Sequence, residues 1–176
     1  YTQFIEEADD ASVLKLFNYF IESGTLYKDE NWDTAIKFAK RNIKEINDYL
    51  CTSGEKDARA IIAAHSKQYA KKLCDDKSFI VRDACIEHSD HTMRLKLLKN
   101  AGLSTKQRLV YTGDPAILDA LTSTDNEFIQ LAIVSQGRKK DLIALTNTPY
   151  KSVRDEIYRS CCIPAIKELN KKRRFL

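Results

Sequence analysis

The feature of this sequence that most restricts its fold is an internal repeat of 24 residues, which continues through five units without a gap. At several positions of the unit, every or nearly every copy is apolar. A fixed period of this length predicts a series of similar supersecondary units. Three such columns are Leu73, Leu97, Leu121, Leu145 and Leu169; Ile61, Cys85, Leu109, Ile133 and Ile157; and Ile62, Ile86, Val110, Val134 and Tyr158.

Each unit is predicted to contain two short helices. In one copy, apolar residues recur at helical spacing over 79–87, which predicts the first helix. A polar break ends this helix at 88–90, and the same break recurs at 112–115 and 136–138 in the next two copies. A second apolar segment, such as 118–121 or 142–145, precedes a cluster of Ser, Thr, Asp and Asn that can cap the next helix. We expect this second helix to be short and partly 3₁₀ in character.

One two-helix unit cannot bury its apolar stripe alone, so the units are expected to stack on one another. The apolar columns would then form a continuous core. The sequence therefore predicts an all-α fold, specifically a right-handed α-solenoid of about five or six short two-helix repeats. The regular units begin near residue 55.

The repeat unit resembles the variant leucine-rich repeat and is similar to short HEAT-like α-helical repeats. The likeness rests on an apolar–Arg opening (Val81-Arg82, Val153-Arg154), a following alanine (Ala84, Ala132) and a closing Leu-x-x-Leu at 118–121 and 142–145. It extends over about residues 55–176 and implies an architecture rather than an activity. Some variant leucine-rich repeat proteins hold an iron–sulfur cluster on clustered cysteines, which this sequence lacks.

The first third of the chain is less regular. Residues 1–32 are predicted to form an N-terminal helical cap, in which Asp9 and Asp10 precede a helix that runs to Ile21. Its aromatic residues Phe17, Tyr19 and Phe20 are expected in the core. Residues 33–176 would form the helical-repeat array, continuous with the cap as one domain.

Composition excludes several classes of protein. With 43% hydrophobic and 31% charged residues, the chain can build a core, and no apolar run approaches the length of a membrane span. The start of the sequence lacks the pattern of a signal peptide. The five cysteines are odd in number and contain no Cys-x-x-Cys, so we expect reduced thiols, no metal, no cofactor and a cytoplasmic location.

The candidate partner-binding residues lie in two adjacent columns at the end of the first helix of each unit. These columns vary in chemistry while their neighbours remain apolar, and variable surface positions are where a repeat protein distinguishes its partners. The alternative is an ordinary solvated face. The candidates are Glu87, Tyr111, Ser135 and Arg159 in one column, with His88 and Gln136 in the next.

Basic clusters suggest an alternative partner, nucleic acid. The net charge of +4 is unevenly distributed, because residues 1–50 sum to −4 and residues 151–176 to +5. A column of Arg82, Lys106, Gln130 and Arg154 either contacts phosphates or bonds the polar turns structurally. The clusters that would contact nucleic acid are Arg138, Lys139 and Lys140, together with Lys171, Lys172, Arg173 and Arg174.

No sequence pattern points to catalysis. The chain contains no Gly-rich phosphate loop, no Gly-x-Ser-x-Gly and no His-Glu-x-x-His. We therefore expect a protein that is not an enzyme and that binds another protein through the surface of its repeats, with nucleic-acid binding as the alternative. No membrane partner is expected.

Overall fold

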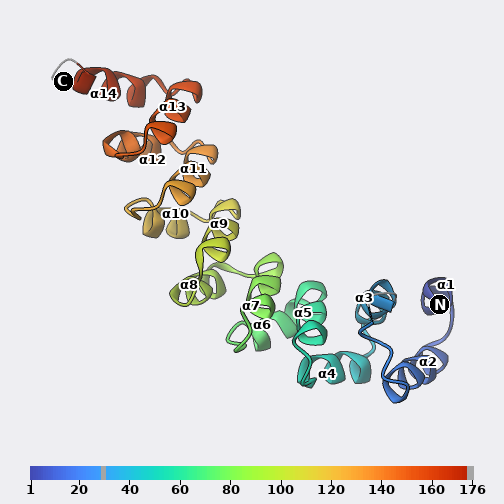
Figure 1. The fold of residues 1–176 in the computed structure, drawn as a ribbon. Coiled ribbons are helices and arrows are strands. Elements are labelled where there is room, and N and C mark those ends of the chain that lie inside the picture. The colour runs from blue at the N-terminus through green and yellow to red at the C-terminus, as the bar shows by residue number, and fades with distance from the viewer. Residues whose placement is uncertain (29–30, 174–176) are drawn as a thin grey trace. The chain divides into compact units, whose positions relative to one another are not determined.

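A computed structural model describes residues 1–28 and 31–173 of the chain, with side chains placed as far as Lys171. The secondary structure of these residues is entirely helical, which confirms the predicted all-α class (Figure 1). The chain divides into two compact units, Tyr1–Leu97 and Leu98–Leu176. Each unit is described by itself below.

The first unit contains two rows of helices that alternate along the chain. Within one row, α1 contacts α3, α3 contacts α5, and α5 contacts α7; within the other, α2 contacts α4 and α4 contacts α6 (Figure 1). The bounds are α1 Thr2–Glu7, α2 Asp10–Glu22, α3 Trp32–Lys40, α4 Lys44–Thr52, α5 Lys56–His65, α6 Lys67–Leu73 and α7 Phe79–Ala84, which continues as the 3₁₀ segment η2 Cys85–His88. Helix α8, His91–Lys99, begins in this unit and ends in the next.

The second unit repeats this arrangement. Helix α9 contacts α11 and α11 contacts α13, while α12 contacts α14. The bounds are α9 Leu103–Tyr111, α10 Pro115–Leu121, α11 Glu127–Ser135, α12 Lys139–Ala144, α13 Lys151–Arg159 and α14 Ile163–Arg173. The 3₁₀ segment η3, Leu145–Asn147, follows α12, so this copy of the second helix is partly 3₁₀, as predicted, whereas α8 and α10 are followed by no 3₁₀ segment.

The predicted apolar columns form the core of both units. Every member of the leucine column is at most 7% exposed, and the column that runs from Ile61 to Ile157 is at most 4% exposed. Of the third column only Tyr158 is not buried. Burial of this apolar surface, at roughly 25 cal/mol per Å², is the main stabilising contribution to the stack.

Short polar side chains cap α2, α10 and α11, whereas α7 and α13 follow Ser78 and Tyr150, which make no side-chain cap. Asp114 precedes α10 and accepts a hydrogen bond from the Ala116 amide at 3.0 Å, with Pro115 at the first helical position. Asn126 precedes α11 and accepts from the Ile129 amide at 3.1 Å. Asp9 caps α2 in the same way. These caps satisfy amides that have no partner within the helix.

The segment predicted as a cap contains one helix more than the sequence analysis expected. Helix α1 precedes the predicted helix, and Ile5 on α1 is fully buried. Arg41, which follows α3, links α3 to the end of α1. Its guanidinium donates to the carbonyls of Glu6 and Ala8, both at 3.0 Å. The first 28 residues therefore include a helix pair, α1–α2, stacked on α3–α4.

The aromatic core of the first unit differs from the prediction at one residue. Phe17, Phe20 and Phe38 are at most 3% exposed, and the Phe17 and Phe38 rings meet edge to face at 5.1 Å between centroids. Tyr19, which was expected in the core, is 60% exposed. Positions two apart on a helix point to different faces, so Tyr19 cannot share the core-facing side of Phe17.

Candidate functional site

The predicted partner-binding residues of the second unit end three adjacent helices. Tyr111, Ser135 and Arg159 are the last residues of α9, α11 and α13, and Gln136 follows Ser135 at the helix C-cap. Because α11 contacts both α9 and α13, these helix ends form a row, which we call the helix-end row: Tyr111, Ser135, Gln136 and Arg159. Tyr111, Ser135 and Arg159 are exposed, while Gln136 is half-buried.

The backbone turns behind the helix-end row are nearly identical in the three copies. Gly113, Gly137 and Cys161 follow the row at 24-residue intervals and adopt φ values of 68°, 70° and 55°. Their amides donate to the carbonyls of Val110, Val134 and Tyr158 at 3.0, 3.0 and 3.3 Å. A left-handed residue just after a helix is a common helix stop. The turns therefore present different side chains on one repeated backbone.

The chemistry of the helix-end row suits recognition of another protein. Tyr111 exposes 60% of its surface, and Arg159 makes an exposed ion pair with Glu156 at 2.9 Å. Thr112 and Ser160, the neighbours of Gln136 in its column, donate their hydroxyls to the Leu109 and Ile157 carbonyls. Gln136 has no hydroxyl for this role. Tyrosine and arginine are enriched among the residues that dominate binding at interfaces.

The two candidates in the first unit are placed differently. Glu87 and His88 end the segment η2, and Glu87 is exposed. The Nε2 atom of His88 lies 2.8 Å from the Ala64 carbonyl of α5. His88 thus links η2 to α5, which gives it a structural role. The structure places the four candidates of the second unit in one row. Glu87 and His88 belong to the first unit and are not part of that row.

The side chains of Arg82, Gln130 and Arg154 each bond to the turn that precedes their own helix. Each side chain donates to the carbonyl six residues earlier, which belongs to Asp76, Thr124 or Thr148, at distances of 2.7 to 2.8 Å. Gln130 also accepts a hydrogen bond from the Thr148 hydroxyl in the next turn. Such bonds give carbonyls of the polar turns a partner within the protein.

Arg59 makes the corresponding bond before Arg82, although a strict 24-residue spacing would place Ala58 in this column. Its guanidinium donates to the carbonyl of Ser53, six residues earlier, at 2.8 Å. It also forms a two-bond ion pair with Asp76, at 2.7 and 3.1 Å, with both side chains 9% exposed. The unit that starts at α5 is therefore one residue shorter than 24. Burial patterns alone could not reveal this shift, because Ala58 through Ala63 are all buried.

Most described members of the basic clusters are already neutralised within the fold. Arg138 bonds to Asp119 and to Asp141, which is 3% exposed, and its Nη1 donates to the Pro115 carbonyl at 3.1 Å. Lys140 pairs with Asp119 at 2.6 Å. Lys171 pairs with Glu168 at 3.1 Å. Lys139, the remaining residue of these clusters whose side chain is described, is exposed, and internal ion pairing does not explain it.

The remaining residues of the basic cluster fall outside what the structure shows. The side chains of Lys172 and Arg173 are not described, and Arg174 lies beyond the described residues. The phosphate-contacting role of this end therefore stays a prediction.

Among residues 1–28 and 31–173, every helix is too short or too polar to cross a bilayer.

The cysteines occupy both the core and the surface. Cys74 and Cys85 are buried, and burial raises the pKa of the Cys85 thiol to about 12. This thiol is therefore uncharged at neutral pH and packs as a small apolar side chain. Cys161 is exposed. Within the described part of the chain, no three His, Cys, Asp or Glu side chains are grouped for a metal ion.

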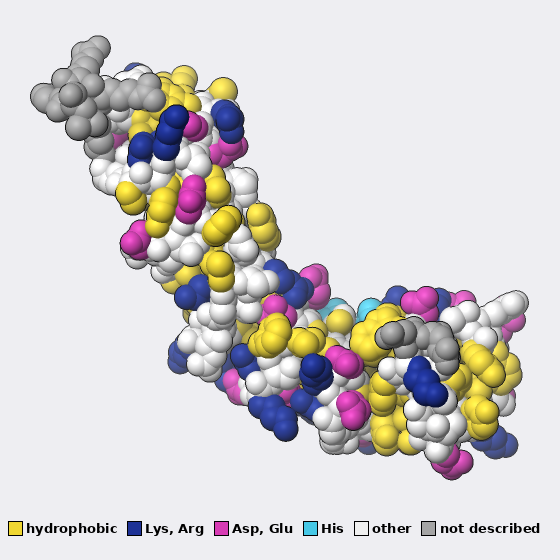
Figure 2. Space-filling model, viewed as in Figure 1, with side chains coloured by type: hydrophobic (Ala, Val, Ile, Leu, Met, Phe, Trp, Pro, Cys, Tyr) yellow, Lys and Arg dark blue, Asp and Glu magenta, His cyan; other side chains and the backbone are white. Residues whose placement is uncertain are grey.

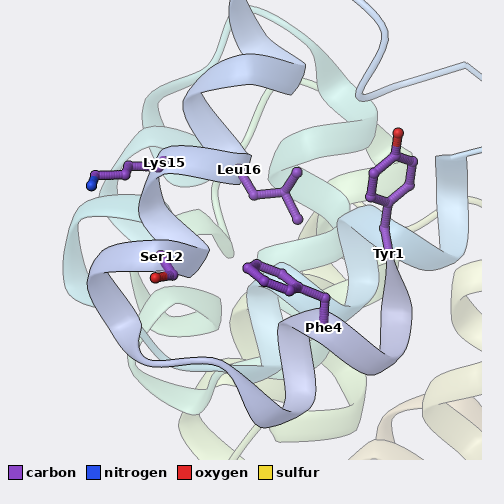
Figure 3. A pocket seen from close by; sticks show the side chains of 5 residues that line it. All are labelled: Tyr1, Phe4, Ser12, Lys15 and Leu16. Atoms are coloured by element: carbon purple, nitrogen blue, oxygen red, sulfur yellow. The ribbon is translucent and has the colours of Figure 1, made fainter.

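The sequence analysis missed an apolar groove between α1 and α2. It has a volume of about 570 Å³ and is lined by Tyr1, Phe4, Ser12, Lys15 and Leu16, which we call the α1–α2 groove (Figure 3). Phe4 is 47% exposed and Tyr1 69% exposed. The adjacent apolar residues Phe4 and Ile5, which precede the Asp9 cap, are the sequence signal that could have revealed a further helix here.

Comparison of the chain with protein-family models, with curated proteins and with solved structures found no match.

Proposed function

We propose that this chain is a right-handed α-solenoid that acts as a non-catalytic interaction module and binds another protein through its helix-end row. The pairwise contacts from one helix pair to the next within each unit support the repeat architecture. The observation that carries the function is the helix-end row itself. Its turns repeat the same backbone, while its side chains change from tyrosine to serine to arginine.

Nucleic-acid binding is less well supported. Arg138 and Lys140, two residues of the predicted phosphate-binding cluster, have carboxylate partners at 2.8 Å or less. A phosphate would have to replace these partners, and Asp141 would then be left buried without its cation. The basic residues of this turn are better explained as links between α10 and α12.

The test is affinity purification from cells that express the chain naturally, with and without nuclease treatment. The bait is the wild-type chain or a variant that carries both Tyr111→Ala and Arg159→Ala. We expect a protein partner that is recovered equally with nuclease and at least about tenfold less by the double variant, because interface energy concentrates in few residues.

The matched control is Phe128→Ala, another aromatic residue of the second unit, 59% exposed and outside the row. It should retain the partner. Equal recovery by the double variant would remove the helix-end row as the site. Recovery of proteins only in the absence of nuclease would favour nucleic acid instead.

A further inference from the structure

The helix-end row presents hydrogen-bond acceptors at intervals of about one repeat. Near the end of each helix, one hydroxyl donates its proton to a backbone carbonyl three residues earlier, at 2.6 to 2.7 Å. These hydroxyls belong to Thr112, Ser135 and Ser160, and Ser135 has this role in the copy where Gln136 stands at the Thr112 position. A hydroxyl that donates its proton still has oxygen lone pairs that can accept. Ser135 and Ser160 are exposed, so a partner that fits the row supplies hydrogen-bond donors.

The row lacks the apolar surface on which a partner helix docks. Tyr111 is its one large apolar side chain, and a Cβ added at Gly137, in the turn after Gln136, would meet no heavy atom within 4 Å. On the face of the second unit that Figure 2 shows, hydrophobic side chains lie in small groups separated by polar side chains and backbone (Figure 2). A helix that binds by burying a continuous apolar face has no matching strip along the row.

The spacing of the repeats matches one backbone conformation of a partner chain. Helices that pack side by side, as α11 does with α9 and α13, have axes about 8–10 Å apart. A polyproline II segment has three residues per turn and rises about 9 Å over them, so every third residue faces the same side. A β-strand faces the same side every second residue, about 7 Å apart, and does not match the repeat. The N–H groups of polyproline II make no internal hydrogen bonds, whereas those of an α-helix are already used.

Arg159 determines the charge of the segment that fits. Its Nη1 donates to Glu156 at 2.9 Å, and the two side chains are 74% and 41% exposed. An ion pair this exposed contributes little to stability, and it uses one of the five N–H groups of the guanidinium. A partner carboxylate can therefore bind Arg159 beside Glu156 or in its place. Two repeats away, the exposed ring of Tyr111 can pack against an apolar or aromatic side chain.

We propose that the helix-end row binds a segment of a partner protein in the polyproline II conformation. An acidic residue of this segment pairs with Arg159, and an apolar or aromatic residue six positions away packs on Tyr111. Backbone amides of the segment donate to the hydroxyls of Thr112, Ser135 and Ser160. The identity of this partner rests on the proposed function, because the same row binds it.

The first experiment selects peptides that bind the row. A phage library of random linear peptides is selected on the purified full chain and depleted on the variant that carries both Tyr111→Ala and Arg159→Ala. We expect the enriched peptides to share an acidic residue and an apolar or aromatic residue six positions apart. A failure to enrich any peptide would overturn the proposal, and so would enrichment of the helical pattern with apolar residues at i, i+3, i+4 and i+7.

The second experiment determines the backbone conformation of the bound segment. Each amide of an enriched peptide labelled with fluorescein is N-methylated in turn, and binding to the full chain is measured by fluorescence anisotropy. Methylation of every third amide should weaken binding about tenfold, whereas methylation of the amides between them should change it less than about twofold. Losses at every second amide would indicate a β-strand and losses at every amide a helix, and either pattern would contradict the proposal.

Single variants assign the contacts. Arg159→Ala should weaken binding of the enriched peptide about tenfold, but should have little effect on a peptide with glutamine in place of the acidic residue. Ser135→Ala removes one acceptor and should weaken binding about threefold. The control Phe128→Ala, at a residue that is 59% exposed and outside the row, should change the affinity less than about twofold. Equal losses in all three variants would show that these contacts do not hold the peptide.

Failure of this proposal can be distinguished from failure of the proposed function. If the double variant loses a natural protein partner but the selection yields no peptide of the expected pattern, protein binding by the row stands and the polyproline II segment is wrong. If the double variant retains the natural partner, the proposed function is itself wrong.

Discussion

At the scale of single residues, polar side chains connect some turns to the next turn along the chain. Arg59 illustrates this role, since it donates to the Ser53 and Gly54 carbonyls behind it and pairs with Asp76 ahead of it. The hydrogen bonds from Arg59 lower the pKa of Asp76. The pair is largely shielded from water, so loss of one partner leaves a buried charge.

We therefore expect Asp76→Asn to lower the free energy of unfolding by about 3 kcal/mol, measured by urea titration of the full chain at pH 7. The neighbouring Asp75 pairs with Lys96 but is 61% exposed, so Asp75→Asn should cost less than about 1 kcal/mol. Similar losses in the two variants would show that burial of the Arg59–Asp76 pair is unimportant.

The same pair should make stability depend on pH. The folded-state pKa of Asp76 is below that of the unfolded chain, so the stabilisation is fully present above about pH 4 and is lost as the pH falls through the folded value. The difference between wild type and Asp76→Asn should consequently shrink in melting curves taken between pH 5 and pH 2.5. A difference that is constant across this range would contradict the ion-pair explanation.

At the scale of elements, the turns after α9, α11 and α13 each contain a residue in the left-handed conformation. Gly113 and Gly137 adopt it without steric cost, whereas Cys161 adopts φ 55° with a side chain. The left-handed conformation costs an ordinary residue roughly 1–2 kcal/mol. Of these three turns, the one at Cys161 therefore carries backbone strain that the two glycine turns avoid.

Cys161→Gly should raise stability by about 1 kcal/mol, and Gly137→Ala should lower it by a similar amount. No heavy atom lies within 4 Å of a Cβ added at Gly137, so the cost there would come from the backbone alone. Thermal melting of both variants checks the prediction. If both substitutions shifted the melting temperature in the same direction, turn conformation would not explain them.

At the scale of the whole molecule, each unit has its own core. The fully buried side chains of the second unit, such as Leu109, Ile133 and Ile157, come from α9, α11 and α13. In a repeat array, stability is approximately a sum of nearest-neighbour terms. A defect in one core should therefore act most strongly on the helices next to it.

Ile133→Ala tests this expectation, because it removes a fully buried side chain from α11 and should cost about 2–5 kcal/mol. Native-state hydrogen exchange should then accelerate in α9, α11 and α13. The amides of α1 to α6 should be affected far less. Uniform acceleration across all described helices would show that the chain unfolds as one cooperative body.

The sequence by itself determined the helical class, the 24-residue unit and the residues of the core. All three follow from periodicity. Positions such as Leu97, Leu121 and Leu145, which are apolar in successive copies, are predicted to be buried, and each of them is. The sequence also placed the helix ends that carry Tyr111, Ser135 and Arg159. It could not decide which basic residues are free to bind.

Only the tertiary structure decided the role of Arg138 and Lys140, whose partner Asp119 lies about twenty residues away along the chain. It also decided the one-residue shift at Arg59, since hydrogen bonds rather than burial distinguish Arg59 from Ala58. The α1–α2 groove likewise depends on how two helices meet. Periodicity reports which face of a helix is buried, whereas pairings between distant residues depend on packing that no local pattern encodes.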